Sequence, residues 1–303
     1  MSSRQPGDLD GHRLPTEVQE LLSQLETLNQ PEDISPRIHL LERVLTLVSR
    51  TDHPTLWADL YVELGDALQR NRMGDRQVQL SRSIDCYDTA LTVYTREGMP
   101  TDWARLLYTR GVALHELAGL LTGSEREKIL RDAVTSFEEI LTIGEHQLGP
   151  ANRMLAQNNK GAFLRELAGM LTGAERAKAL QEALACLNEV LQHEEYREIA
   201  PIIWAAAQSN KGSTLRDLAE LLTDPEQQLA MVHDAIACYD ASLSVYTHKE
   251  ASTDWAAAQN NKGAALSYLS PLISSEKRRE KLEEAITCYD AALTVYTHEV
   301  ALE

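Results

Sequence analysis

Amide and guanidinium side chains recur at fixed intervals in the second half of this chain. Asn159, Asn210 and Asn261 lie 51 residues apart, and arginine follows the first two by six residues. A side-chain amide both donates and accepts hydrogen bonds, and a guanidinium binds a carboxylate through two parallel bonds. These groups suit the recognition of an extended or acidic-ended peptide. The candidate binding residues are Asn158, Asn159, Arg165, Asn210, Arg216, Asn260 and Asn261.

The sequence offers little for catalysis or metal binding. The nine histidines are scattered, and no HExxH motif, glycine-rich phosphate loop or nucleophile elbow occurs. The four cysteines show no CxxC spacing and occupy one equivalent position of a repeat, so we expect them to be packed thiols, too far apart for disulfides. We therefore predict no catalytic residue, no metal site and no cofactor, and a protein that is not an enzyme. The cysteines are Cys86, Cys186, Cys238 and Cys288.

A repeat positions these residues. One glycine recurs at intervals of 46, 50, 51 and 51 residues, and the last two copies read WAAAQSNKGSTL and WAAAQNNKGAAL. A period of this size indicates a stacked array in which each repeat contacts only its neighbours. Helical periodicity without alternating apolar residues predicts an all-α chain. The recurring glycines are Gly65, Gly111, Gly161, Gly212 and Gly263.

We expect residues 1–14 to form a disordered tail and residues 15–303 a single solenoid of antiparallel helix pairs. In this prediction, Ser35 caps the second helix of an N-terminal pair, with Pro36 at its first position. Thr122, Thr172 and Thr223, each with glutamate three residues later, predict capping boxes at later second helices. The predicted cap pair spans 15–50, and the predicted repeats span 55–97, 101–146, 151–196, 202–248 and 253–300.

The second helices carry the most specific pattern. SIDCYDTAL, AIACYDASL and AITCYDAAL place a small residue, an aromatic residue four later and another small residue seven later. With the glycine of the first helix, this pattern resembles the tetratricopeptide repeat, in a long form of about 50 residues found in bacteria. The resemblance implies a right-handed superhelix whose first helices line a concave groove. It implies a protein–protein interaction scaffold, and the asparagine and arginine row would lie in that groove.

The same residues also permit a plainer interpretation, in which asparagine is only a tolerated polar residue on a wet helix face. A second row, Gln157/Lys160, Gln208/Lys211 and Gln259/Lys262, falls within the apolar arc of the first helices. Lysines there must either extend their ammonium groups to the edge of the helix or pair with carboxylates, for which Asp240 and Asp290 are candidates. We expect structural pairing there rather than ligand contact.

The last repeat predicts a second interaction surface. Its second helix keeps an apolar face of the kind that receives a following repeat, and such a face marks an interaction site when uncovered. We expect a homodimer there. The alternatives to a groove-binding scaffold are therefore a self-assembling structural protein acting through this helix pair, or a regulatory subunit of a separately encoded enzyme. The predicted face consists of Ile286, Tyr289, Leu293 and Tyr296.

The charge and hydropathy of the sequence exclude two classes of partner, nucleic acids and membranes. The net charge of −17 argues against nucleic acid, because binding to phosphate depends on Lys and Arg displacing counterions. No apolar run reaches the roughly 18 residues that span a bilayer, and the polar N-terminus lacks a signal-peptide core. We expect a cytoplasmic protein with a protein or peptide partner, without nucleic-acid or membrane binding.

Overall fold

The computed structural model describes residues 13–249 and 251–300, so most of the predicted tail lies outside the described residues. Within those ranges every regular element is a helix and no strand occurs, which confirms the all-α prediction. The chain divides into two compact units on either side of the Leu148–Gly149 bond, and each is described by itself.

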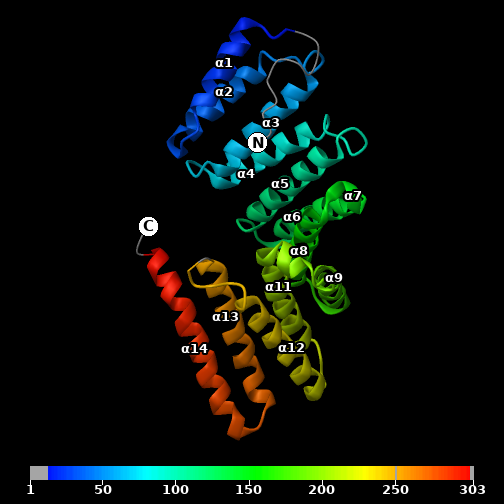
Figure 1. Cartoon of the computed structure of the whole chain (residues 1–303), viewed down its shortest axis with the longest axis vertical. Coiled ribbons are helices and arrows are strands. Elements are labelled where there is room, and N and C mark those ends of the chain that lie inside the picture. The colour runs from blue at the N-terminus through cyan, green and yellow to red at the C-terminus, as the bar shows by residue number, and fades with distance from the viewer. Residues whose placement is uncertain (1–12, 250, 301–303) are drawn as a thin grey trace. The chain divides into compact units, whose positions relative to one another are not determined.

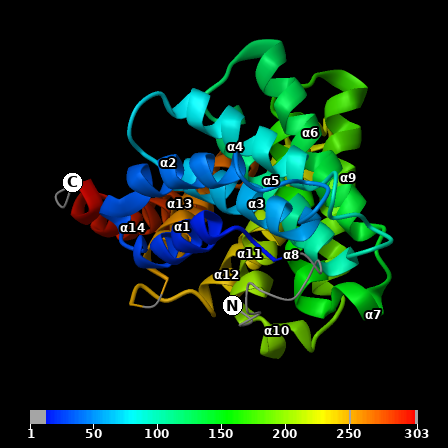
Figure 2. The same cartoon turned by 90° about the horizontal axis from the view of Figure 1, so that it is seen from above.

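In the first unit, successive helices pack against one another along the chain, and the N-terminal helices pack against the next pair (Figures 1 and 2). The strongest packing joins the two helices of a pair, α3 with α4 and α5 with α6, and the pairs meet where α4 packs on α5. The helices are α1 (Thr16–Thr27), the 3-10 turn η1 (Pro31–Asp33), α2 (Ile34–Leu45), α3 (Pro54–Arg70), α4 (Arg76–Ala90), α5 (Pro100–Ala118), α6 (Gly123–Leu141) and α7 (Glu145–Leu148).

The second unit repeats this arrangement. Here α11 packs against α12, its partner in the pair, and also against α8 and α9 before it and α13 after it. This stacking of consecutive helix pairs is that of an α-solenoid; its right-handed superhelix stays a prediction. The helices are α8 (Pro150–Ala168), α9 (Gly173–Leu191), α10 (Tyr196–Ile199), α11 (Pro201–Ala219), α12 (Pro225–Leu243), α13 (Ser252–Leu269), the 3-10 turn η2 (Ser270–Leu272) and α14 (Ser275–Val300).

The recurring glycine lets the two helices of a pair approach closely. A Cβ atom on Gly212 would lie 2.9 Å from Tyr239 Cε1 and 2.9 Å from the carbonyl oxygen of Ala235, closer than real Cβ contacts. Tyr239 is fully buried, so the aromatic ring fills the space that glycine leaves. The same contact joins Gly65 with Tyr87, Gly111 with Phe137 and Gly263 with Tyr289, and Leu187 takes the place of the ring opposite Gly161.

A second recurring contact lies at the end of a helix pair where its first helix begins and its second helix ends. The guanidinium of Arg50 lies 5.2 Å from the ring centre of Trp57, and that of Arg197 lies 5.0 Å from Trp204, each seven residues further on. A cation above the face of an indole ring is attracted by its negative electrostatic potential. Arg50 also donates to Thr92 Oγ1 (3.0 Å), just beyond the end of α4. The arginine thereby ties the start of α3 to the end of α4.

Several of the predicted helix caps are wrong. Thr122 and Thr172 occupy the N-cap positions of α6 and α9, but neither side chain makes a capping hydrogen bond. Gly123 and Gly173, which follow them, have φ angles of +60° and +55°, so these helices lack the regular first turn that a capping box requires.

Two further caps lie on residues other than the predicted ones. For α12 the cap is Asp224 rather than Thr223, and its carboxylate accepts a bond of 3.0 Å from the Glu226 amide. Ser35 does not cap α2, because α2 begins at Ile34, directly after η1, and Ser35 is the second residue of the helix.

The four cysteines are buried and form no disulfide, which confirms the expected thiols. Burial raises the pKa of the Cys86 thiol to about 12 and also raises the pKa values of Cys238 and Cys288. A thiol reacts as its thiolate, so these side chains act as small apolar packing residues at neutral pH.

Candidate functional site

The predicted binding row lies along the first helices of the second unit, on α8, α11 and α13. Asn210 on α11 donates from Nδ2 to Asn158 Oδ1 on α8 over 3.0 Å. Asn158 is only 7% exposed, so its expected place on a wet face is wrong. The reason is the neighbouring helix: α11 packs on α8 and covers this amide, which becomes part of the contact between pairs. Ser213 is likewise buried, in hydrogen-bond contact with the Tyr239 hydroxyl at 3.0 Å.

The two predicted arginines converge on one carboxylate. Arg165 Nη1 on α8 lies 3.0 Å from Asp217 Oδ2, and Arg216 Nη2 lies 2.9 Å from Asp217 Oδ1. The Asp217 side chain is 15% exposed, so water screens these ion pairs less than it would on an open surface. Asp217 thus holds the place between the arginines that a ligand carboxylate would occupy. It also ties α8 to α11.

The remaining asparagines are more accessible. Asn260 on α13 is exposed, while Asn159 and Asn261 are partly exposed. The side chain of Asn158 donates to Asn159 Oδ1 at 3.3 Å. In the described part of the chain, the amide groups of Asn260 and Asn261 have no hydrogen-bond partner. The amides on α13 are therefore available as donors and acceptors, whereas Asn158 on α8 and Asn210 on α11 bond to each other.

In the last repeat, the lysine of the second row, Lys262, forms ion pairs within the protein, as expected for a structural role. Lys262 Nζ lies 2.8 Å from Asp240 Oδ1 on α12 and 3.1 Å from Glu284 Oε1 on α14, so Asp240 is a partner as predicted. Asp290 is exposed instead, without an ion pair among the described residues. Burial alone would lower the pKa of Lys262, but its hydrogen bonds to Asp240 and Glu284 outweigh burial and raise that pKa.

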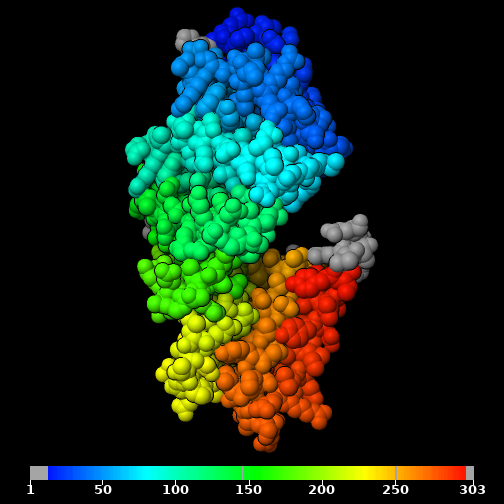
Figure 3. Space-filling model, turned by 180° about the vertical axis from the view of Figure 1, so that it is seen from behind, coloured from blue at the N-terminus to red at the C-terminus, as the bar shows by residue number. Residues whose placement is uncertain are grey.

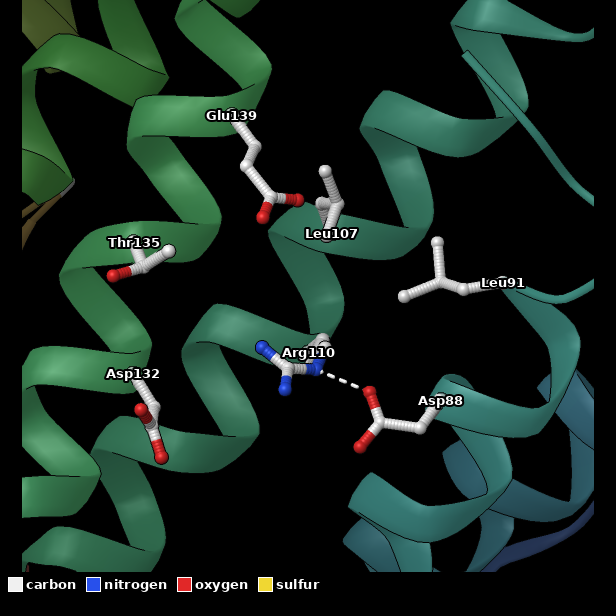
Figure 4. Close-up of a pocket in the computed structure, with 7 residues that line it drawn as sticks. All are labelled: Asp88, Leu91, Leu107, Arg110, Asp132, Thr135 and Glu139. Atoms are coloured by element: carbon white, nitrogen blue, oxygen red, sulfur yellow. Dashed lines mark hydrogen bonds and ion pairs between the residues drawn. The ribbon is translucent and has the colours of Figure 1, made fainter.

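A hollow of about 280 Å³ opens in the first unit and was not predicted from the sequence (Figure 4). Arg110 takes the position that lysine holds in later repeats, and its Nε lies 2.5 Å from Asp88 Oδ1. Three carboxylates and one guanidinium line the hollow, leaving an excess of negative charge. Its residues come from α4, α5 and α6 and from the residue that follows α4: Asp88, Leu91, Leu107, Arg110, Asp132, Thr135 and Glu139.

The predicted C-terminal face divides into two sides of α14. Ile286 and Leu293 are exposed by 58% and 52%. Tyr289 instead packs over Gly263, and Tyr296 packs against the buried cluster of Ala256, Ala292 and Val295. In the space-filling view, α14 (red) forms one edge of the second unit and its outer side is uncovered (Figure 3).

Comparisons with known proteins leave the function open. No family model and no curated protein matches the chain. A solved circular tandem repeat protein, described as having a novel repeat topology and enhanced subunit contact surfaces, is 19% identical over 93% of this chain and 71% of its own, with a TM-score of 0.39. A structure from the computational design of self-assembling cyclic protein homooligomers is 13% identical over 93% and 91% of the two chains, with a TM-score of 0.14. At these scores neither likeness carries an argument.

Two further properties concern the described residues. None of their helices combines the length and the apolar character required to cross a bilayer. They also contain no group of three or more histidine, cysteine, aspartate or glutamate side chains arranged to hold a metal ion.

Proposed function

We propose that the chain is a non-catalytic scaffold that binds an extended protein segment along the face formed by α8, α11 and α13. The observation that carries this proposal is the amide pair of Asn260 and Asn261, which continues the asparagine row but has no partner among the described residues. Asparagine is a poor helix former, so an unpaired pair in mid-helix needs a reason other than helix stability. Hydrogen bonds to the backbone of a partner supply such a reason.

The arginines take a different part in this proposal. A ligand carboxylate would have to displace Asp217, which already binds Arg165 and Arg216. We therefore assign these two arginines to holding α8 against α11, where they keep the asparagine row in line. In this proposal the asparagine amides recognise the backbone of the partner segment, and no arginine binds an acidic end of it.

The wider assignment rests on the sequence pattern and the cysteines. The glycine–aromatic contact, which occurs in four of the five pairs that carry the recurring glycine, supports a long-period form of the tetratricopeptide repeat. Four buried cysteines without a disulfide agree with a reducing compartment, and we place the protein in the cytosol.

The first experiment identifies the partner. A photo-cross-linking amino acid replaces Asn261, and the matched control carries it at Gln227, an exposed residue of α12. A segment bound along the asparagine row cross-links at position 261 and not at 227. Equal capture at both positions would point to non-specific contact.

The second experiment tests the amides. The double variant Asn260→Ala/Asn261→Ala keeps wild-type stability, because it removes no internal hydrogen bond and alanine favours helix. Its affinity for the captured partner falls several-fold, since each lost hydrogen bond is worth about 0.5–1.5 kcal/mol. The control Asn158→Ala leaves the Asn210 amide without its acceptor and lowers the stability instead. Wild-type affinity of the double variant would refute the proposal.

Self-assembly is the second candidate function, favoured by the uncovered residues of α14. It involves a different surface from the asparagine row.

A further inference from the structure

An apolar stripe runs along the outer side of α14. Leu282, Ile286 and Leu293 are exposed by 39%, 58% and 52%. Their spacing of four and seven residues places them on one face of the helix. Within the described part of the chain no other helix covers this stripe. Tyr289 and Tyr296, in contrast, face the interior of their own helix pair.

The preceding pair shows what such a stripe is built to contact. In the repeat alignment that matches Ala235 with Ala285, the counterparts of the stripe are Val232, Ile236 and Leu243 on α12. Val232 is fully buried. Ile236 packs against the buried cluster of Leu266, Ala285 and Cys288, and Leu243 packs in the cluster that contains Ala258. Here α13 covers the equivalent face, so the stripe on α14 is suited to receive a helix.

We infer that the helix received is α14 of a second copy of this chain, antiparallel and related by a two-fold axis. The exposed side of α1 cannot take this place, because Glu17, Glu20, Gln24 and Glu26 make it polar and acidic. Head-to-tail stacking would therefore bury carboxylates against leucine and isoleucine, at a high desolvation cost. Two copies of the stripe are complementary to each other, and an isologous contact closes the assembly at two subunits.

The register follows from the positions of the apolar residues. An axis midway between Leu282 and Leu293 sets each of these opposite the other in the partner copy. The two Ile286 side chains then meet beside the axis, about 4.5 Å apart along the helix direction at 1.5 Å per residue. The two Thr297 residues, which lie near the stripe but far from the axis, are separated by about 28 Å.

The area buried between the two copies of α14 indicates how stable the dimer is. At 26 residues, α14 is about 39 Å long, and a contact about 10 Å wide covers roughly 400 Å² on each subunit. The total falls below the range of about 1,200–2,000 Å² that stable protein interfaces bury. The dimer therefore belongs to the weak, transient class of interfaces.

The first test measures mass as a function of concentration. Sedimentation equilibrium of the wild type shows a rise from monomer to dimer, and Ile286→Glu/Leu293→Glu stays monomeric with an unchanged circular dichroism spectrum. The matched control Ile202→Glu changes a residue of α11 that is 51% exposed, and it dimerises like the wild type. A wild type that remains monomeric at about 1 mM, or a double variant that dimerises normally, overturns the inference.

The second test determines the orientation. Ile286→Cys and Thr297→Cys are each treated with a short thiol-to-thiol cross-linker under native conditions, where the four natural cysteines are buried. The antiparallel dimer cross-links through position 286 and not through position 297. Cross-linking through both positions indicates parallel helices and refutes the register. Because this surface is separate from the asparagine row, the monomeric variant keeps its affinity for the segment bound along that row.

Discussion

Replacing Gly212 with alanine tests whether the recurring glycine is a packing requirement. In an open helix the change would stabilise the protein by about 1 kcal/mol, because glycine is a poorer helix former than alanine. Here the new methyl group lies 2.9 Å from Tyr239 and 2.9 Å from the Ala235 carbonyl oxygen. Overpacking of this kind costs about 1–3 kcal/mol. The backbone oxygen cannot move aside without shifting α12, so the cost lies in the upper part of this range, at about 2–3 kcal/mol. Subtracting the helix-propensity gain of about 1 kcal/mol leaves an expected net loss of about 1–2 kcal/mol.

Two further glycines provide the controls. The three atoms nearest to a Cβ on Gly263 all belong to the ring of Tyr289, whose hydroxyl contact with Ser267 is long at 3.4 Å. The ring can therefore shift, and Gly263→Ala costs less than Gly212→Ala. Gly144→Ala meets nothing within 4 Å and changes stability by less than about 0.5 kcal/mol. Urea unfolding followed by circular dichroism measures all three, and hydrogen exchange locates the loss in α11 and α12. A Gly212→Ala variant at least as stable as the wild type would refute the packing argument.

Three other predictions concern charge and thiols. The four buried cysteines resist alkylation at pH 8 in the folded protein and react fully after denaturation without reductant, as a thiol titration measures. Asp217→Ala leaves two arginines without their shared carboxylate and lowers the unfolding free energy by about 1.5–3 kcal/mol, whereas Asp217→Asn costs less in the same urea assay. Burial alone would raise the pKa of Glu284, but hydrogen bonds to Lys281 and Lys262 lower it. The stabilisation from this carboxylate is present above its unfolded value of about 4.3 and is lost as the pH falls through the lower folded value, so Glu284→Gln shows a flatter acid dependence in thermal unfolding.

The repeat and its class of fold could be read from the sequence, because a glycine that faces a large apolar side chain, aromatic in all but one repeat, recurs at each period. Helix starts were less predictable. Thr122 satisfies the capping pattern, yet the adjacent Gly123 adopts a φ of +60° and the hydroxyl makes no cap bond. A pattern of residue types does not report such a backbone angle.

The candidate site depended on contacts between repeats, which periodicity within one repeat does not contain. Asn158 and Asn260 hold equivalent positions, but the first is buried by a neighbouring helix and the second is exposed. Asp217 follows Arg216 directly, and nothing in that sequence neighbourhood shows that it also reaches Arg165, 52 residues away. The hollow beside Arg110 was missed for the same reason, since three helices line it; arginine at a lysine position was the available signal.

Two of the contacts described above act at different levels of the array. The glycine–aromatic contact of Gly212 with Tyr239 joins the two helices of one pair, whereas the bond from Lys262 to Asp240 joins one pair to the next. The packing within a pair is also more extensive than the packing between one pair and the next. Partial unfolding therefore releases whole pairs rather than single helices, and a protease would cut first in the connections between pairs. The digestion products would then form a ladder with steps of one repeat.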